Sequence, residues 1–156
     1  MNQQSPPPLE IPIQRLPHGQ GLPLPTAQSA HAAGLDVVAA VPEAEPMVIE
    51  PGAIGLVPLG FAIAVPVGYE AQVRPRSGLA TKHGISMPNT PGTVDADYRG
   101  EMFVPLINHG REAFTVTRRM RVAQMLIKPV PPVRLFEVDE LPATDRGAGG
   151  FGSTGH

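Results

Sequence analysis

Short apolar blocks separated by proline and glycine run along most of this chain. Leu9, Ile11 and Ile13 alternate with other residues around Pro12, a pattern that favours an edge strand. Later blocks recur at a spacing of roughly 8–12 residues, which is typical of a β-sandwich or barrel. The predicted strands cover residues 9–16, 35–41, 47–49, 54–65, 69–74, 101–108, 113–117, 121–130 and 133–138.

Helical periodicity is nearly absent from the sequence. One short helix is predicted, with Ser77 as its N-cap, residues 78–82 as its body and an end near Gly84. Residues 1–8 are polar and proline-rich, and we expect them to be a disordered lead. Residues 9–138 then form one β domain, and residues 139–156 form a flexible polar tail.

Composition agrees with a single domain that has its own core. The chain has 156 residues, of which 42% are hydrophobic and 4% aromatic. We therefore expect a core of Val, Ile, Leu, Ala and Met. A net charge of −2 implies no general nucleic-acid or membrane partner. No transmembrane run or signal peptide is recognised, so a cytoplasmic protein is expected.

Cysteine is absent, which excludes disulfides, a thiolate nucleophile and thiolate metal ligands. The five histidines are isolated in sequence, so no zinc site held by protein ligands is expected. Ten of the twelve cationic residues are arginine. Arginine suits phosphate groups, although a coding bias explains this composition equally well.

The C-terminal segment 146–156 combines Arg146, five glycines and Phe151. Glycine-rich backbone can approach an anion closely, so the segment resembles a flexible strap that closes over a nucleotide. It is not a P-loop, because Ser153 stands where that motif has lysine. A disordered tail is the alternative.

A first internal constellation follows the predicted strand 69–74. Arg76, Ser77 and Gly78 lie at the start of the predicted helix, where free backbone N–H groups favour phosphate. Plain helix capping by Ser77 is the alternative.

A second constellation covers residues 89–101, where Pro91-Gly92 predicts a hairpin. On a regular strand, Asp95 and Asp97 share one face and Tyr98 lies on the other. A carboxylate such as Asp95 can deprotonate a water, and Asn89 offers the donor and acceptor that complement a pyrimidine edge. The alternative is that the aspartates are turn residues and Tyr98 belongs to the core.

Two more polar residues adjoin apolar strands. Asp36 follows Ala33-Gly34-Leu35, and Gln124 ends Arg121-Val122-Ala123-Gln124. A turn aspartate and a hydrogen-bonded edge glutamine are the alternatives.

Read in order, five segments resemble the five motifs of the trimeric dUTPases: 33–36, 75–80, 92–101, 121–124 and 146–155. The resemblance spans residues ~10–155, and the order of five motifs is far more specific than any one of them. It implies a jelly-roll-like β fold with one short helix and a homotrimer. Three active sites would lie at subunit interfaces, and the tail of one chain would close a site formed by the other two.

The resemblance also implies residue roles in hydrolysis of dUTP to dUMP and pyrophosphate. Asp95 would be the general base that directs a water onto the α-phosphorus. Tyr98 would exclude a 2′-hydroxyl, and a tight loop around Asn89 would reject a 5-methyl group. The substrate-binding residues would be Arg76, Ser77, Gly78, Asn89, Thr93, Tyr98, Gln124, Arg146, Phe151, Gly152, Ser153 and Thr154.

Mg²⁺ is the implied cofactor, held by triphosphate oxygens and waters, with Asp36 reaching it through water. The implied cellular role is to supply dUMP for thymidylate synthesis and to keep uracil out of DNA.

Two features depart from the family pattern. The turn Thr117-Arg118-Arg119-Met120 lacks the usual glycine and acidic residue, which leaves the turn geometry and any phosphate role of Arg121 open. Met87-Pro88 and Pro91 make the surroundings of Asn89 unusually stiff.

Three other functions remain as alternatives. One is a dCTP deaminase of the same fold, although no deaminase signature is recognised. Another is a nucleotide-sensing module without chemistry, and the third is a structural β-barrel with a disordered tail.

Overall fold

The computed structural model describes residues 7–150, which form short strands, one 3-10 turn and one α-helix. The elements in chain order are β1 (Ile13–Arg15), η1 (Pro17–Gly19), β2 (Leu35–Val38), β3 (Met47–Ile49), β4 (Ile54–Pro58), β5 (Phe61–Ile63), β6 (Tyr69–Arg74), α1 (Ser77–His83), β7 (Ile85–Ser86), β8 (Gly92–Val94), β9 (Phe103–Asn108), β10 (Phe114–Val116) and β11 (Arg121–Pro129).

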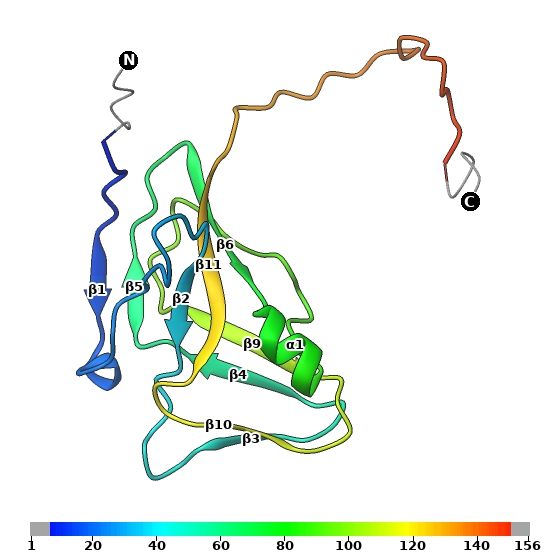
Figure 1. The fold of residues 1–156 in the computed structure, drawn as a ribbon. Coiled ribbons are helices and arrows are strands. Elements are labelled where there is room, and N and C mark those ends of the chain that lie inside the picture. The colour runs from blue at the N-terminus through cyan, green and yellow to red at the C-terminus, as the bar shows by residue number, and fades with distance from the viewer. Residues whose placement is uncertain (1–6, 151–156) are drawn as a thin grey trace.

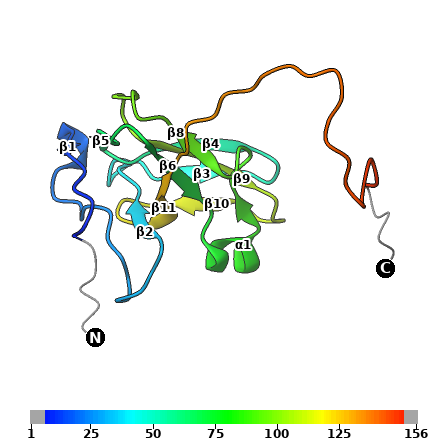
Figure 2. The same ribbon diagram turned by 90° about the horizontal axis from the view of Figure 1, so that it is seen from above.

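All strand pairs are antiparallel, and they form four small sheets (Figures 1 and 2). The largest has the order β2-β11-β6-β8, and the next has the order β4-β9-β7. The pairs β1-β5 and β3-β10 complete the body. The predicted all-β class with one short helix is confirmed.

The core lies between these sheets and is built almost entirely from small and branched apolar side chains. Val57, Val104 and Val116 are completely buried, and Phe61 and Phe114 are the aromatic members of the main buried cluster. The predicted reliance on Val, Ile, Leu, Ala and Met is therefore confirmed.

One predicted strand, 54–65, is two strands. β4 ends at Pro58 and β5 begins at Phe61, because Gly60 adopts a φ of 70° that turns the chain between them. Gly60 also lies against the backbone of Gly19, where an added Cβ would come within 2.5 Å of the Gly19 Cα atom. Both the positive φ and the close approach to Gly19 therefore require glycine at position 60.

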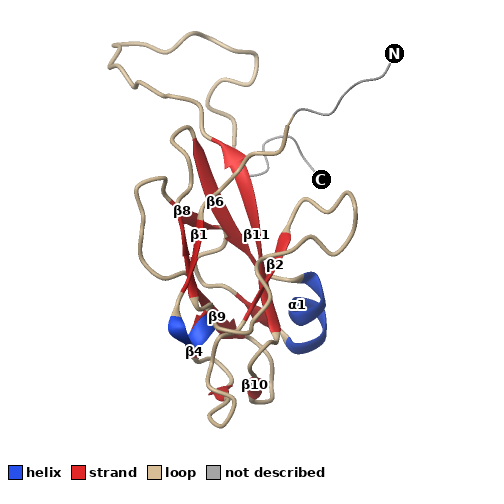
Figure 3. Cartoon of the chain, turned by 90° about the vertical axis from the view of Figure 1, so that its left-hand side faces the viewer, coloured by secondary structure: helices blue, strands red, loops and turns tan. Residues whose placement is uncertain are grey.

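The predicted strand 133–138 is wrong. β11 ends at Pro129, and the chain then leaves the body as an extended arm with no strand partner (Figures 1 and 3). Pro131 and Pro132 have no N–H to donate, so ladder pairing cannot continue through them. Leu135 is 92% exposed, so its apolar side chain is not buried against any other part of this chain. Of the predicted strand 9–16, only Ile13–Arg15 forms a strand, β1.

The helix begins one position earlier than predicted. Arg76 occupies the N-cap position and makes no side-chain cap, so Ser77 is the first helical residue rather than the cap. Gly84 ends the helix as predicted, with a left-handed C-cap. Within residues 7–150, no helix has the length and apolar character needed to cross a membrane.

Candidate active site

The four-stranded sheet brings together four of the five segments singled out in the sequence. Asp36 lies on β2 directly opposite Gln124 of the neighbouring β11. On its other side, Gln124 lies opposite Arg74, and β6 then leads directly into Arg76 and α1. β8, which carries Thr93, pairs with the far edge of β6.

Asp36 is the centre of an ionic cluster. Its Oδ2 atom lies 3.4 Å from Nε of Arg76 and 3.2 Å from Nη1 of Arg121. Arg76 also donates from Nη1 to the backbone carbonyl of Arg121, at 3.3 Å. Two guanidinium groups facing one carboxylate leave a net positive charge, which favours an anionic ligand.

Exposure within this cluster follows a gradient. The side chain of Asp36 is 14% exposed, that of Arg76 is 26% exposed and that of Arg121 is 47% exposed. The carboxylate therefore lies beneath the two guanidinium groups, which remain open to a ligand from solvent.

Gln124 is not an edge residue, because β11 lies between β2 and β6. Its Nε2 atom donates to the carbonyl of Pro75 at 3.0 Å. This bond ties the strand to the segment that leads into Arg76, so Gln124 has a structural partner already.

Ser77 and Gly78 are exposed on the first turn of α1. The backbone carbonyl of Ser77 accepts a bond from the hydroxyl of Thr81 at 2.9 Å, while no side chain caps the helix start. The capping alternative for the Ser77 hydroxyl is therefore wrong.

The segment around Asp95 forms a second centre, separate from the ionic cluster. A cavity of about 200 Å³ is lined by Thr93, Val94, Asp95, Tyr98, Glu101, Met102 and Phe103. None of the ionic-cluster residues lines it. The structure thus places Thr93, Asp95 and Tyr98 together, as predicted, but apart from Asp36, Arg76 and Gln124.

Asp95 to Tyr98 form a turn, so the expectation of a regular strand there is wrong. β8 ends at Val94, and the N–H of Tyr98 donates to the carbonyl of Asp95 at 3.1 Å. Tyr98 is 43% exposed, so the alternative that it belongs to the core is wrong as well.

Tyr98 is held in place by contacts with the residues that follow it. Its hydroxyl donates to the carbonyl of Glu101 at 2.8 Å. An added Cβ at Gly100 would lie 2.5 Å from that hydroxyl oxygen, so only glycine leaves room for the ring. Gly100 belongs to the motif 92–101, but nothing in the sequence alone assigns it a role.

Asn89 lies exposed in the turn between β7 and β8. Its amide folds back toward the strand, since an added Cβ at Gly92 would lie 3.3 Å from the Asn89 Nδ2 atom. The Asn89 amide therefore lies beside the start of β8.

The unusual turn 117–120 forms without glycine. The N–H of Met120 donates to the carbonyl of Thr117 at 3.1 Å, and Arg119 adopts a positive φ of 68°. The guanidinium of Arg118 donates to the carbonyls of Val41 and Gln20 at 3.2 and 3.1 Å. The turn is thus well anchored and leaves Arg121 facing Asp36.

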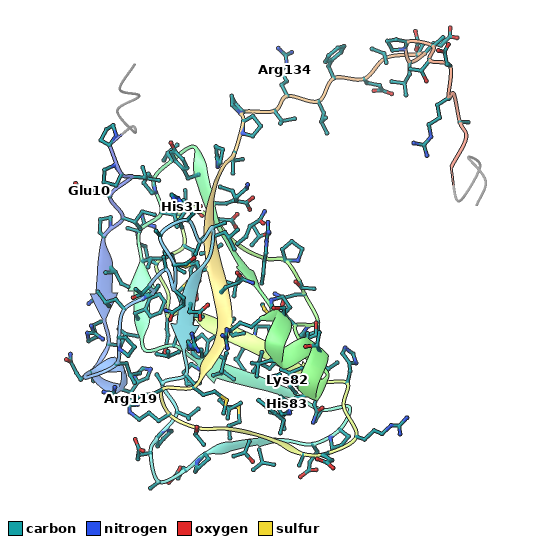
Figure 4. All side chains as sticks on the ribbon, in the orientation of Figure 1. Glu10, His31, Lys82, His83, Arg119 and Arg134 are labelled. Carbon is teal, nitrogen blue, oxygen red and sulfur yellow. The ribbon has the colours of Figure 1, made fainter. Side chains whose placement is uncertain are left out.

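Arg146 lies on the arm, away from both centres. Its Nε atom donates to the carbonyl of Gly149 at 2.8 Å. Side chains along the arm, Arg134 among them, extend into open space (Figure 4). The other predicted arm contacts, Phe151, Gly152, Ser153 and Thr154, lie outside the described residues.

One contact of the ionic cluster was missed by sequence reasoning. Gln28, from the long connection before β2, accepts a hydrogen bond from Nη1 of Arg121 at 3.1 Å. No sequence signal marks this residue, because the connection has neither apolar periodicity nor a recognisable motif.

A comparison with protein-family models matches residues 20–155 to the dUTPase family. Among solved structures, the chain is similar to a Staphylococcus bacteriophage 80alpha dUTPase bound to dUpNHpp. The two are 22% identical with a TM-score of 0.83, over 94% of this chain and 99% of that one.

A second similar structure is the dUTPase from phage phi11 of S. aureus, which contains a structural Mg(II) ion. It is 20% identical with a TM-score of 0.74, and the match covers 85% of this chain and 98% of that one. These two likenesses confirm the jelly-roll-like β fold.

Proposed function

The chain belongs to the dUTPase family and is a dUTP diphosphatase, and from this premise we propose how its residues hydrolyse dUTP. The observation that carries the proposal is the ionic cluster, in which Asp36 orients Arg76 and Arg121 beside Gln124. This cluster receives the triphosphate, together with Ser77 and Gly78 on the first turn of α1. Arginine suits this role because its planar fork pairs with two phosphate oxygens at once.

The Asp95 cavity receives the deoxyuridine. Tyr98 forms its floor beneath the sugar and excludes a 2′-hydroxyl, and Thr93 lines the same cavity. Asn89 and the neighbouring backbone bind the uracil edge, where a 5-methyl group would clash. Rejection by clash discriminates more strongly than the ~1–3 kcal/mol that the fit of one methylene supplies.

Asp95 acts as the general base. Its carboxylate accepts a proton from a water as the water oxygen bonds to the α-phosphorus. The bond from that phosphorus to the bridging oxygen of the β-phosphate breaks, and pyrophosphate leaves with the electron pair. The chain contributes positioning and charge neutralisation, which dominate phosphoryl chemistry.

The donor chemistry of the chain fits Mg²⁺ as the cofactor. Residues 7–150 contain no group of three or more His, Asp or Glu side chains able to hold a metal. Mg²⁺ commonly keeps waters and binds substrate phosphates, so it needs no such group. Bound with the substrate, Mg²⁺ would supply neutralisation of phosphate charge. Asp36, whose carboxylate is already shared by Arg76 and Arg121, would help to hold it through water.

We propose a homotrimer in which one chain supplies the ionic cluster and another supplies Asp95. Val94 pairs with Ala71, so Asp95 lies at the opposite end of β6 from Arg76. The stretch from Ala71 to Arg76 spans roughly 17 Å at the strand rise of about 3.3 Å per residue. A general base and a phosphate clamp for one substrate are therefore better supplied by two chains.

The outer face of β4 and β9 supports this assembly. Three cross-strand pairs on that face contain no polar side chain: Ile54 with Ile107, Leu56 with Pro105, and Pro58 with Phe103. A sheet that is apolar on both faces is typical of one covered on both sides. Phe103 also lines the Asp95 cavity, so a neighbour bound to this face would lie beside that cavity.

The arm of a third chain closes each site. Arg146, Ser153 and Thr154 clamp the γ-phosphate, Gly152 lets the backbone approach it, and Phe151 covers the base. We propose that the protein acts in the cytoplasm, where it supplies dUMP for thymidylate synthesis and keeps uracil out of DNA.

Product analysis tests the function directly. The chain is incubated with Mg²⁺ and, separately, with dUTP, dCTP, dTTP and UTP, and products are resolved by ion-exchange chromatography. Release of dUMP and pyrophosphate from dUTP alone is the expected result. Conversion of dCTP would favour a deaminase, and inactivity with all four nucleotides would favour a nucleotide-sensing module.

A further inference from the structure

The connection between η1 and β2 contributes a polar contact to the ionic cluster. Gln28 lies in this connection and is exposed, yet its Oε1 atom accepts a hydrogen bond from Nη1 of Arg121 at 3.1 Å. We propose that Gln28 is a positioning residue, which fixes the Arg121 guanidinium for the triphosphate. This inference rests on the proposed function of the cluster.

The backbone around Gln28 is attached to the site strand. Thr26 and Asp36 form a bridge in which each N–H donates to the other's carbonyl, at 3.3 and 2.9 Å. The hydroxyl of Thr26 donates in turn to the carbonyl of Leu24 at 2.6 Å. The segment that carries Gln28 is therefore fixed to β2 beside the carboxylate that holds both arginines.

The amide of Gln28 has a defined orientation. Its Nε2 atom donates to the carbonyl of Thr26 at 3.2 Å, which leaves the amide oxygen to face Arg121. Glutamine is suited to this arrangement, because it carries a donor for the loop backbone and an acceptor for the guanidinium.

The two acceptors around Arg121 use the same nitrogen. Nη1 lies 3.2 Å from Asp36 Oδ2 and 3.1 Å from Gln28 Oε1, so both of its hydrogens have partners. A guanidinium has five N–H groups, and the three on Nε and Nη2 remain for phosphate oxygens. With only one acceptor, the group could rotate about its long side chain. With two, its plane is set before the substrate arrives, which lowers the ordering cost of binding.

The test is binding of dUpNHpp with Mg²⁺ by isothermal titration calorimetry, followed by steady-state hydrolysis of dUTP. The variant is Gln28→Leu, which keeps the side-chain size and removes both hydrogen bonds. We expect Kd to rise about fivefold, as suits loss of an exposed hydrogen bond between a neutral amide and a guanidinium, with a larger effect on KM than on kcat. Gln20→Leu is the matched control, because the Gln20 side chain is exposed in the same region and makes no hydrogen bond within residues 7–150.

A double-mutant cycle with Arg121→Gln separates positioning from a general loop effect. If Gln28 acts through Arg121, Gln28→Leu leaves Kd unchanged in the Arg121→Gln background. An unaltered Kd in the single variant would overturn the inference, as would an equal rise in both backgrounds. The binding readout does not require turnover, so failure of the Gln28 role and absence of dUTP hydrolysis are distinguishable.

Discussion

At the scale of single residues, Asp36 shows how one side chain sets the geometry of a site. Its carboxylate is the least exposed member of the cluster, and two arginines converge on one of its oxygens. Partly exposed ion pairs contribute little to stability, typically about 0–1 kcal/mol. The value of Asp36 therefore lies in orienting Arg76 and Arg121 rather than in holding the fold.

Asp95 gives the sharpest prediction at this scale. Asp95→Asn keeps the size and polarity of the side chain but removes the base, so kcat should fall by at least about 100-fold. The Kd for dUpNHpp should change little, because binding uses other groups. Steady-state kinetics measures kcat, and isothermal titration calorimetry measures the Kd.

Asp97 provides the control for Asp95. It belongs to the same turn and is exposed, but it does not line the cavity. Asp97→Asn should therefore retain normal turnover. Full activity of the Asp95→Asn variant would show that Asp95 is not the general base.

At the scale of elements, the sequence predicts strands well wherever apolar alternation ends at a clear turn. β3 and β6 have the predicted bounds, because proline or glycine residues adjoin them. The segment 95–98 alternates as a strand would, yet a local hydrogen bond closes it into a turn. Residues 133–138 have the composition of a strand but no neighbouring strand to pair with, which a single sequence cannot reveal.

The same limit explains which site contacts were foreseen. The family resemblance implied that Arg76 and Gln124 bind phosphate and that Asp36 reaches Mg²⁺ through water, and each of these residues adjoins a recognisable strand. It left the role of Arg121, the second arginine of the ionic cluster, open. The contact from Gln28 depends on how a long connection returns to β2 through the Thr26–Asp36 bridge. No local pattern encodes that return, so only the three-dimensional structure reveals it.

The outer face of β4 and β9 leads to a prediction about assembly. Leu56→Asp puts a charge at the centre of the six-residue apolar face, where Leu56 is now 55% exposed. Burying an unpaired charge between chains is costly, so the variant should be a folded monomer by light scattering and circular dichroism. It should also lose dUTP hydrolysis.

Val48 serves as the comparison, since it is also 55% exposed but lies on β3 opposite Thr115, outside that face. Val48→Asp should remain trimeric and active. A trimeric Leu56→Asp variant would show that the chains associate through another surface.

The arm gives the second prediction at this scale. Removal of residues 146–156 should leave the melting temperature and the trimer unaffected, because Arg146, the first residue removed, is exposed and its side chain bonds only to the nearby carbonyl of Gly149. The value of kcat/KM should fall severely, since the γ-phosphate loses its clamp. Arg146→Ala should reproduce part of this loss, whereas Arg134→Ala, on the same arm, should not. An unchanged kcat/KM after truncation would disprove closure by the arm.

At the scale of the whole molecule, the distribution of groups implies that one chain is not a complete catalyst. The ionic cluster and the Asp95 cavity share a sheet but lie at opposite ends of β6. Closed cyclic symmetry solves this problem, because each interface can join the cluster of one chain to the cavity of the next. Each site would then be lost if either contributing chain were defective.

Mixed trimers test this arrangement without any structural probe. Asp95→Asn and Arg76→Ala are each expected to be inactive alone. Co-expressed in equal amounts, they form trimers in which some sites receive Asp95 from one variant and Arg76 from the other. Random assembly gives both intact residues at roughly one quarter of the sites, so about a quarter of normal activity should return.

The control pairs Asp95→Asn with a chain carrying both substitutions, a mixture in which no site can be complete. It should remain inactive at any ratio. If the first mixture also stayed inactive while light scattering showed mixed trimers, each chain would have to complete its own site. Asp95 and Arg76 would then have to approach each other by movement of the turn that follows β8 or of α1. Recovery near one quarter would instead explain why the Asp95 cavity opens beside an apolar sheet face, since the surface that joins the chains would also complete the catalyst.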